Sequence, residues 1–495
     1  MKRIKLHNEP KLVTKFASFP YQKAAVDAIK DKEYAGIFHE QGLGKTKIAI
    51  DLLLYWLEST DIDTVIIDTK KQLVHNWINE FELHTYLKPM VITSNSSNNF
   101  YTFTSGTRVI ITNFEAVKSE RSRFELFLKT RNVAIIIDES AKLKNPNSEL
   151  TKVYFELSTY FKKRVIMTGT PVANRPYDIW AQIYFLDQGK SLGKDFKLFK
   201  RTTELSNDLA DNNLKQQEFE KILSGIYKKI EGFSVRETKN SGIVSLPEKK
   251  YIRVDADFEL EQYNLYQKIC KEMIVEVEKD GISSLDDSSA NVKRLLRLLQ
   301  VSSNPFLLDE KYKLRSGKFK KLKNTIDNIV KKNEKCIVWT CFIENVEYFN
   351  KIFCDYGCVK IHGKMPIAER NKSIDKFRNK EYKILFATPA SSKEGLTLTM
   401  ANHVIFYDRG FSLDDYLQAQ DRIHRISQDK VCYIYNIIMK NSIDEWVDVL
   451  LDAKENAALL VQGDISLAQY RKQINYCYGD ILKSILYPDR GESNE

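Results

Sequence analysis

A glycine-rich loop stands between a short apolar run and a long apolar helix pattern. The run AGIFH leads into EQGLGKT, and KIAIDLLLYWLE follows. Gly42 and Gly44 let main-chain N–H groups approach phosphate oxygens. Lys45 can reach the outer phosphates, and the Thr46 hydroxyl can ligate Mg²⁺. His39 replaces the first glycine of the strict motif, so a chance match in a surface loop is the alternative. The flanking strand and helix patterns favour a triphosphate-binding site.

Two acidic residues end a second apolar run, VAIIIDES. At the carboxyl end of a parallel strand, the side chains of Asp138 and Glu139 would emerge at the edge of the sheet. Asp138 can hold Mg²⁺ through water, while Glu139 can orient and deprotonate an attacking water. An acid pair that caps the next helix is the alternative. Together with the phosphate loop, the pair predicts hydrolysis of a nucleoside triphosphate.

Two arginines lie three residues apart in QAQDRIHRISQ. On a helix, this spacing would place the guanidinium groups of Arg422 and Arg425 on one face. There they could reach across a cleft between two lobes to the γ-phosphate as arginine fingers. A solvated basic helix face is the alternative. The position of the motif after HVIFYD, in a second lobe, favours the fingers.

Short β-branched runs must position these residues. Because near-continuous apolar strands belong in parallel sheets covered on both faces, the runs predict two α/β lobes. The runs in the first half are AGIFH, TVIID, RVIIT, VAIIID and RVIMT, and those in the second half are CIVWT, VKIHG, KILFAT, HVIFYD and CYIYNII.

The strand rhythm disappears between about Gly189 and Asn333, where helical spacing predicts mostly helices. After the last strand, NSIDEWVDVLLDAKENAALL predicts a C-terminal helix, with Ser442 and Glu445 at the spacing of a capping box. We therefore divide the chain into four parts. These are a first lobe with a helical protrusion at 1–230, a connector at 231–250, a second lobe with its own protrusion at 251–450, and a helical segment at 451–495.

The composition is that of a folded globular protein. Hydrophobic residues make up 43% and charged residues 29% of the 495, and 76 Lys and Arg against 66 Asp and Glu leave a net charge of +10. Seven scattered cysteines without a CxxC pair predict buried thiols and no structural metal. Without a membrane-spanning run or a signal sequence, we expect a cytoplasmic protein, or a nuclear one in a eukaryote. The abundance of Lys, Asn and Ile favours a bacterial or phage source.

Ten motifs in this order resemble those of the Swi/Snf-type DNA translocases of helicase superfamily two: FPYQ, HEQGLGKT, VIIDTKKQLVHNWINEF, VIITNFE, DESAKLKN, VIMTGTPVANRPYDIW, SGK, CIVWTCF, SSKEGLTLTMANHVIFYD and QAQDRIHRISQ. The match covers most of the chain. TGTPVANRP and GLTL look most like the branch that contains fork-remodelling annealing helicases. The resemblance implies two RecA-like parallel-sheet lobes with helical insertions, and it implies ATP and Mg²⁺ as cofactors.

The resemblance also implies roles for single residues. Tyr21 and Gln22 would read the adenine, and Gly395 would close on the nucleotide from the second lobe. Thr168 would couple the nucleotide to DNA, and Gln428, which ends the last motif, would help to bind the nucleotide. The residues that would bind and hydrolyse MgATP are Gly42, Gly44, Lys45, Thr46, Asp138, Glu139, Arg422 and Arg425.

Five residues are candidate nucleic-acid contacts, because Lys, Asn and Thr commonly bind phosphates. They are Lys70, Lys71, Asn113, Thr168 and Thr340. Ordinary solvated side chains are the alternative for the two lysines. Trp77, which stands seven residues after Lys70, is expected to pack a helix rather than to stack on a base.

Three departures from the family pattern are present. Ala141 replaces the His expected after the acidic pair, and Ser427 replaces the usual glycine. Ser392 and Lys393 stand where glycines often occur. None of these changes removes a phosphate ligand, the water activator or a finger, so the ATPase is expected to be active.

The leading hypothesis is an ATP-driven translocase on double-stranded DNA. A strand-separating, branch-migrating or annealing helicase in replication, recombination or repair is the alternative within the enzyme class. A nucleic-acid clamp or scaffold with a degenerate motor is the alternative outside it, and it would bind ATP without turnover. Forked or branched DNA is a further candidate partner.

Overall fold

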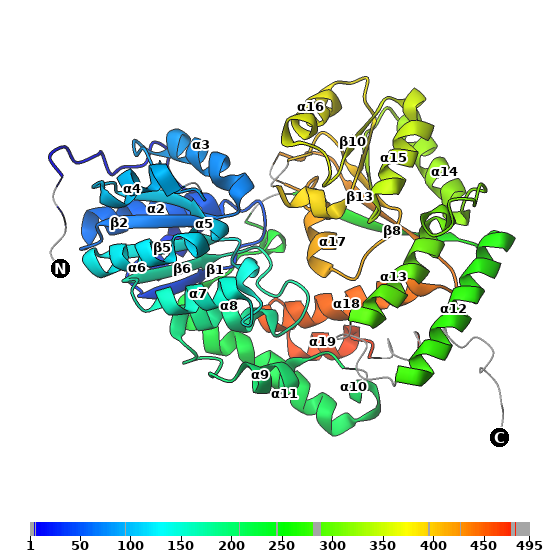
Figure 1. Ribbon diagram of the computed structural model, residues 1–495, viewed down its shortest axis with the longest axis horizontal. Helices are drawn as coiled ribbons and strands as arrows, with labels where there is room; N and C mark the ends of the chain where they lie inside the picture. Colours follow the sequence, from blue (N-terminus) through cyan, green and yellow to red (C-terminus); the bar gives the residue numbers. More distant parts are fainter. Residues whose placement is uncertain are drawn as a thin grey trace. The chain divides into compact units, whose positions relative to one another are not determined.

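The computed structural model describes residues 4, 6–94, 96–206, 208–243, 246–280, 289–394, 397–425, 427–476 and 481. Its contacts divide the chain into two compact units, each built around one parallel sheet (Figure 1). The first unit comprises Met1–Glu204, Glu218–Ser245 and Ala457–Leu467. The second unit comprises Leu205–Gln217, Leu246–Asn456 and Ala468–Glu495. The chain passes between the two units at several places, and one of these, after Ser245, lies within the segment 231–250.

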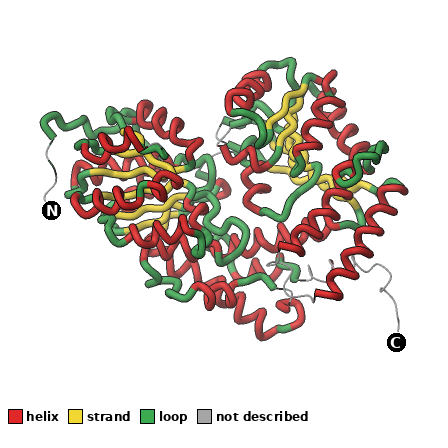
Figure 2. The backbone as a smooth tube through the Cα atoms, viewed as in Figure 1, coloured by secondary structure: helices red, strands yellow, loops and turns green. Residues whose placement is uncertain are grey.

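The first unit contains a seven-stranded sheet in the order β3-β4-β2-β5-β6-β1-β7. Helices cover both faces of this sheet (Figure 2). Its strands are β1 (Tyr34–Ile37), β2 (Thr64–Thr69), β3 (Met90–Val91), β4 (Val109–Asn113), β5 (Val133–Asp138), β6 (Lys163–Met167) and β7 (Ser234–Val235). Its helices are α1 (Pro20–Ile29), α2 (Lys45–Ser59), α3 (Val74–His84), α4 (Ser96–Thr104), α5 (Phe114–Ser119), α6 (Arg121–Thr130), α7 (Glu149–Ser158), α8 (Asp178–Asp187), α9 (Phe196–Thr203) and most of α11 (Asn213–Ile230).

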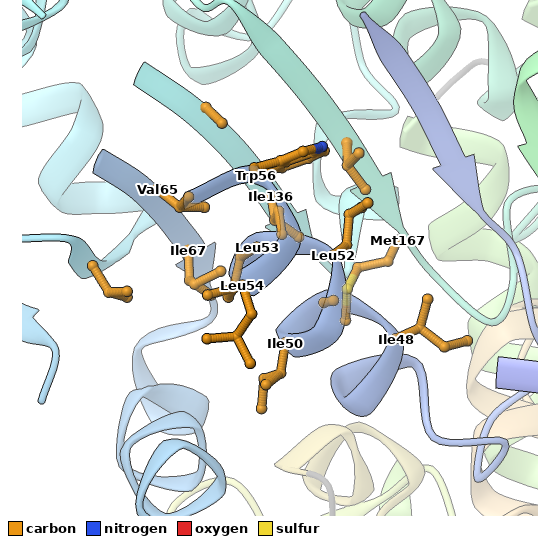
Figure 3. Packing of buried hydrophobic residues seen from close by; sticks show 14 of the residues in the cluster. Ile48, Ile50, Leu52, Leu53, Leu54, Trp56, Val65, Ile67, Ile136 and Met167 are labelled. Atoms are coloured by element: carbon orange, nitrogen blue, oxygen red, sulfur yellow. The ribbon is translucent and has the colours of Figure 1, made fainter. Parts of the chain in front are cut away.

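Helix α2 anchors the core of the first unit. It is apolar around most of its circumference, and Ile48, Leu53 and Trp56 are completely buried. Figure 3 shows these residues packed against side chains of β2, β5 and β6, including Ile67 and Met167. Full burial of one such side chain stabilises the fold by about 1.5–3 kcal/mol. The loop before α2 is therefore attached to one of the most rigidly packed elements of the unit.

The second unit contains a six-stranded parallel sheet in the order β10-β11-β9-β12-β13-β8. Its strands are β8 (Lys249–Ala256), β9 (Cys336–Trp339), β10 (Cys358–Ile361), β11 (Ile384–Ala387), β12 (His403–Phe406) and β13 (Cys432–Met439). Its helices are α10 (Asp208–Asp211), α12 (Leu260–Asp280), α13 (Ser289–Ser303), α14 (Gly317–Lys331), α15 (Ile343–Ile352), α16 (Ile367–Arg378), α17 (Leu413–Gln420), the first part of α18 (Ile443–Gln462) and α19 (Leu467–Gln473).

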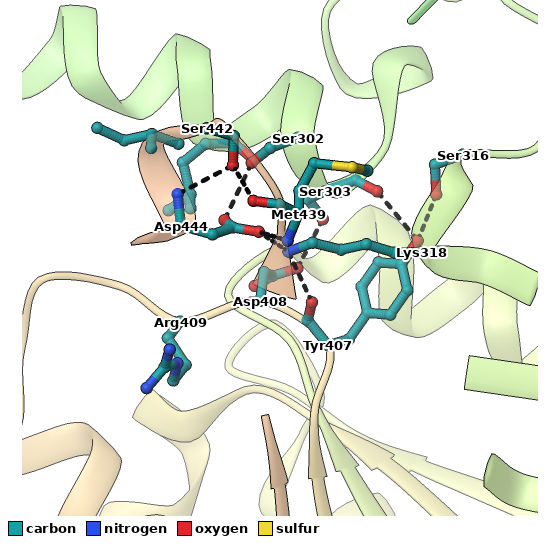
Figure 4. A network of polar contacts seen from close by, with 12 residues as sticks. Ser302, Ser303, Ser316, Lys318, Tyr407, Asp408, Arg409, Met439, Ser442 and Asp444 are labelled. Atoms are coloured by element: carbon teal, nitrogen blue, oxygen red, sulfur yellow. Dashed lines mark hydrogen bonds and ion pairs between the residues drawn. The ribbon is translucent and has the colours of Figure 1, made fainter. Parts of the chain in front are cut away.

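A buried polar network ties α14 and α18 to the end of β12 in the second unit (Figure 4). Lys318, the lysine of the SGK motif, is fully buried and forms an ion pair with Asp444 in the first turn of α18. Its ammonium group also donates to the Tyr407 carbonyl at 3.1 Å. Asp444 accepts further bonds from the Met439 N–H at 2.8 Å and the Ser302 hydroxyl at 3.1 Å. The SGK lysine is thus a structural residue in this protein.

All ten predicted strands are present in the described residues, and so are the mainly helical middle region and the C-terminal helix. The expected connector at 231–250 is not a simple linker, because it contributes β7 to the first sheet and begins β8 of the second. Helix α18 begins at Ile443, before the boundary expected at 451. Within the described residues, no helix is long and apolar enough to cross a membrane.

Replacement of Lys318 by Met tests the buried ion pair. Because Asp444 is 4% exposed, the substitution leaves a buried carboxylate without its cation. We expect the free energy of unfolding in urea to fall by roughly 3–5 kcal/mol. Lys323→Met is the control on the same helix, since it breaks the more exposed pair with Asp327 and is expected to have a much smaller effect. Equal losses in the two variants would contradict the assigned role of Lys318.

Candidate nucleotide-binding site

The glycine-rich loop of the first unit connects β1 to α2. Gly42 and Gly44 have φ angles of 87° and 68°, a region that favours glycine. A Cβ atom at Gly44 would lie 2.2 Å from the Gln22 side-chain nitrogen, so position 44 also lacks space for a side chain. The Lys45 ammonium group folds across the loop and donates to the carbonyls of His39 at 3.0 Å and Glu40 at 3.2 Å. The loop thus places Lys45 and the N-terminal turn of α2 at the carboxyl end of β1.

The TGT sequence after β6 contacts this loop directly. A Cβ atom at Gly169 would lie 2.7 Å from the Gln41 side chain and 3.4 Å from the Lys45 ammonium nitrogen. Thr168 is fully buried, and its N–H donates to the Ile37 carbonyl at 3.2 Å. Only glycine therefore allows the loop after β6 to approach the phosphate loop this closely.

An aromatic cluster lies beside the loop, where the sequence predicts the adenine site. Tyr21 stacks on Phe19 with 6.0 Å between ring centroids and on His39 with 6.2 Å. The Tyr21 hydroxyl donates to the Leu43 carbonyl at 3.2 Å. Gln22 is buried, and its side-chain oxygen accepts from the Phe19 N–H at 3.0 Å. Phe19 is 59% exposed, so the cluster offers an accessible aromatic face next to the loop.

Asp138 at the end of β5 is held by the segment that follows β2. Its Oδ2 atom accepts from the Trp77 indole N–H at 2.8 Å and from the Thr69 hydroxyl at 3.2 Å. Burial raises the pKa of the Asp138 carboxyl, whereas the hydrogen bond from Trp77 and the nearby Lys45 charge act to lower it. The indole of Trp77 is 2% exposed. Trp77 packs in the core, as expected, but its bond to Asp138 was not predicted.

Glu139 has an unusual main-chain conformation for a residue with a side chain. Its φ angle of 61° places it in the left-handed region, which costs roughly 1–2 kcal/mol relative to the usual helical region. Its Oε1 atom lies 3.3 Å from the Lys70 ammonium nitrogen. The two side chains are 16% and 22% exposed, respectively. Residues 69–77 therefore supply partners to both acids of the predicted pair.

Hydrogen bonds from a distant segment hold the main chain just before the glycine-rich loop, and the sequence did not predict them. The Phe38 N–H donates to the Val235 carbonyl at 2.8 Å, and the Phe38 carbonyl accepts from the Arg236 guanidinium at 2.7 Å. Arg236 also forms a two-point ion pair with Asp464, with Nε 2.6 Å from Oδ1. Gly463 adopts a φ of 75°, and a Cβ atom there would collide with the Tyr227 ring. A residue more than 400 positions away thus supports the phosphate loop.

The predicted finger arginines do not lie on a helix. Helix α17 ends at Gln420, and Arg422 and Arg425 lie in the turns that follow. The Arg425 guanidinium donates to the Asp421 carbonyl at 3.0 Å and to the Thr397 hydroxyl at 2.8 Å. The assumption of a shared helix face is therefore wrong. After Gln420 the Ile423 N–H bonds to the carbonyl three residues before it, and the Arg422 carbonyl accepts from the Leu398 N–H rather than from a following residue.

The buried side chain of Gln428 stabilises this turn region through hydrogen bonds. Its side-chain N–H groups contact the carbonyls of Thr399, Ala401 and Ile423 at 2.9–3.2 Å, and its oxygen accepts from the Lys430 N–H. Its side chain is 5% exposed. These bonds give Gln428 a structural role in this turn region.

Two of the departures from the family pattern are visible here, and others are not. Ser427 shares a hydrogen bond with the Thr399 hydroxyl at 2.9 Å, and Ala141 lies in the short 3-10 helix after Glu139. Gly395, which was expected to close on the nucleotide, lies outside the described residues, and so do the side chains of Ser392 and Lys393.

The five candidate nucleic-acid contacts differ in their surroundings. Thr168 and Thr340 are fully buried, and the Thr340 hydroxyl donates to Asp408 at 2.7 Å. Asn113 is 4% exposed and caps α5 by accepting from the Ala116 N–H. These three side chains have internal partners and are buried, so in this structure they offer a phosphate little or no accessible surface. Lys71 is exposed and remains a candidate contact, as does Lys70, which is partly exposed.

The described residues contain no cluster of three or more His, Cys, Asp and Glu side chains that could hold a metal ion by themselves. Any metal at the acid pair would therefore depend on ligands from a bound nucleotide or water. Thr46 and Asp138 could supply the protein oxygens.

Family comparisons agree with this arrangement. The family described as the SNF2-related domain matches residues 21–307, and the helicase conserved C-terminal domain matches residues 317–427. The chain belongs to the SNF2-related family. The first match covers the glycine-rich loop and the acid pair, and the second ends just after Arg422 and Arg425. These SNF2-related and helicase C-terminal regions account for most of the chain.

Several known proteins are similar to this SNF2-related chain. YwqA of Bacillus subtilis, whose name describes an ATP-dependent helicase/translocase, is 26% identical over 459 residues, which cover 88% of this chain and 48% of that protein. An uncharacterized ATP-dependent helicase of Mycoplasma pneumoniae is 28% identical over 445 residues, covering 86% and 40% of the two chains. The chain thus spans less than half the length of these relatives. Among solved structures, the Sulfolobus solfataricus SWI2/SNF2 ATPase core in complex with dsDNA has 23% identity and a TM-score of 0.43, covering 95% of this chain and 99% of that one.

Replacement of Trp77 by Phe tests the hydrogen bond to Asp138. The ring packing is largely kept, but Oδ2 loses its indole donor, and a bond to a charged group contributes about 1.5–3 kcal/mol. We expect weaker binding of Mg²⁺ with a fluorescent ATP analogue, measured by titration with and without Mg²⁺. Trp56→Phe is the control, because its buried N–H donates to the Lys30 carbonyl instead. An equal effect of both substitutions on Mg²⁺-dependent binding would contradict the assignment.

The buried His39 predicts a loss of stability in acid. Burial and the nearby Lys45 charge lower the pKa of His39 to about 4, from an ordinary value near 6.5. Because the unfolded chain binds the proton more readily, this stability is present above pH 6.5 and is lost as the pH falls toward 4. Between these limits, the free energy of unfolding should fall by roughly 3 kcal/mol more in the unsubstituted protein than in His39→Gln. Lys45→Met should reduce the difference, whereas parallel curves for the protein and His39→Gln would show that His39 does not titrate in this range.

Proposed function

We propose that this chain is a nucleic-acid-dependent ATPase that uses ATP hydrolysis to move along double-stranded DNA. The observation that carries the proposal is the meeting of three loops at one edge of the first sheet. The loop before α2 presents Lys45, the loop after β6 packs on it through Gly169, and β5 ends in the acid pair. This is the set of groups that phosphoryl transfer to water requires.

The residues present fit a magnesium-bound nucleoside triphosphate. Mg²⁺ prefers oxygen ligands and phosphates, and Thr46 and Asp138 offer a hydroxyl and a carboxylate at this edge. The Lys45 charge is close enough to Asp138 to act on its pKa. When bound, the metal would neutralise charge on the phosphates. Lys45 would hold the outer phosphates, Glu139 would take the proton of the attacking water, and the Tyr21 and Gln22 region would receive the adenine.

Double-stranded DNA as the track rests on family membership and charge rather than on a described surface. The relatives are named for helicase and translocase activities, and the net charge of +10 suits a polyanionic partner. Lys71 offers an exposed ammonium group after β2. Arg422 and Arg425 remain proposed arginine fingers, and the annealing-helicase branch remains a finer assignment suggested by TGTPVANRP and GLTL.

Turnover measurements with Glu139→Gln test the proposed chemistry. We expect ATP hydrolysis by the unsubstituted protein to rise with duplex DNA more than with RNA, and to fall by about a hundredfold or more in Glu139→Gln, because an amide cannot accept the proton. Binding of a fluorescent ATP analogue should be retained in the variant. Glu125→Gln, a surface acid of the same unit, is the control. Normal hydrolysis by Glu139→Gln would show that the acid pair is wrongly assigned.

Further assays separate the alternatives. Displacement of a triplex-forming strand from duplex DNA would indicate translocation, whereas release or annealing of single strands would indicate a helicase or annealing activity. ATP binding without turnover on any nucleic acid would favour a clamp with a degenerate motor. Turnover that no nucleic acid changes would overturn the proposal of a DNA-dependent motor.

A further inference from the structure

One segment of the first unit holds both acids of the proposed catalytic pair. Thr69 and Trp77 donate hydrogen bonds to Asp138, and Lys70 forms an ion pair with Glu139. The register of β2 against β5 explains this, because Asp68 pairs with Ile137 and the chain beyond it runs past the end of β5. The residues that follow β2 are therefore placed to act on the water-activating group itself.

The contact between Lys70 and Glu139 differs from the two bonds to Asp138 in its exposure. Trp77 is buried and Thr69 is fully buried, but the Lys70 side chain is 22% exposed. Lys70 has an extended main chain and precedes the short 3-10 helix Lys71–Leu73, with the exposed Lys71 beside it. Of the three groups that contact the acid pair, the Lys70 ammonium group is thus the one that a ligand in solution can reach.

A carboxylate oxygen that accepts from an ammonium group is less available to accept a proton from water. The left-handed main chain at Glu139 sets the direction of its side chain, and its carbonyl is occupied by the Lys142 N–H at 3.1 Å. Lys70 is one of the side-chain partners that hold the carboxylate in this position. Partly exposed ion pairs are weak, typically about 0.2–1 kcal/mol. A polyanion with one charge per roughly 1.7 Å of duplex can compete for such a lysine.

We propose that Lys70 is a positioning residue that restrains Glu139 in the absence of nucleic acid, and that a nucleic-acid phosphate takes over Lys70 and releases Glu139 for water activation. The proposal rests on the proposed function and adds a route by which the nucleic acid controls hydrolysis. It involves one exchange of partners and no new covalent step. The phosphate gains an ammonium partner, and the Glu139 oxygen gains access to water.

Steady-state ATPase measurements on Lys70→Met and Lys70→Arg test this exchange. Without nucleic acid, Lys70→Met should raise kcat about 1.4- to fivefold, the range that corresponds to the loss of an ion pair of about 0.2–1 kcal/mol. The KM for ATP should be unchanged, since Lys70 does not contact the proposed phosphate site. The stimulation ratio with duplex DNA should fall, because the basal rate has risen. Lys70→Arg keeps the cation and should behave like the unsubstituted protein.

The matched control is Lys129→Met, which removes an equal charge and an ion pair with Glu125 on α6. It should change neither the basal rate nor the stimulation. Lys70→Gln serves as a second charge-removing variant, and a melting curve for each variant reports folding. A basal kcat of Lys70→Met and Lys70→Gln at or below that of the unsubstituted protein would overturn the proposal. A rise in the DNA concentration needed for half-maximal stimulation, without a change in basal kcat, would reduce Lys70 to a simple DNA contact and would also overturn it.

The proposed function and the proposed restraint on Glu139 can fail separately. If the unsubstituted protein is not stimulated by any nucleic acid, the proposed function fails. If it is stimulated normally but the Lys70 variants show no higher basal rate, only the proposed restraint on Glu139 fails.

Discussion

Parallel pairing in the first sheet is the constraint on which the candidate site depends. Because β6 pairs with both β5 and β1, the loops after these three strands emerge at the same edge and next to one another. The acid pair, Gly169 and the glycine-rich loop come from separate segments of the chain, yet a Cβ atom at Gly169 would lie only 3.4 Å from the Lys45 ammonium nitrogen. The apolar packing of α2 then fixes the end of the loop from which Lys45 projects. The placement of these groups at one edge of the sheet is therefore a consequence of strand order and of one buried helix.

The sequence predicted the parts of the fold whose signals are local. Central strands such as VAIIID are buried on both faces and read as continuous apolar runs, so all of the predicted strands are found. β8 was missed because KKYIRVDA is an edge strand with charged residues on its exposed face, and β7 because it has only two residues. The turn containing Arg422 and Arg425 was misjudged as helical because the spacing of the two arginines does not reveal that the Arg422 carbonyl bonds to Leu398, in another segment.

The site residues also divide into those with a local sequence signal and those whose contacts depend on the fold. Glycine positions, the loop lysine and the acid pair carry motif signals that need no tertiary information. The bond from Trp77 to Asp138 could not be read from the sequence, because a buried tryptophan is ordinary and the direction of its N–H depends on the fold. Arg236 and Asp464 lie 228 positions apart, and nothing in either segment indicates the other. Lys70 was predicted as a phosphate contact, and the structure adds an ion pair with Glu139, which could not be read from the sequence.

The most direct test measures the affinity for duplex DNA, without nucleotide, in a double-substitution cycle. The four proteins compared are the unsubstituted protein, Glu139→Gln, Lys70→Met and the double variant. If Glu139 and a DNA phosphate compete for Lys70, removal of the Glu139 charge must tighten DNA binding only when Lys70 is present. We expect a lower Kd for Glu139→Gln than for the unsubstituted protein, and equal Kd values for Lys70→Met and the double variant. The same change in Kd on Glu139→Gln in both backgrounds would contradict this expectation, because the two side chains would then act independently on DNA.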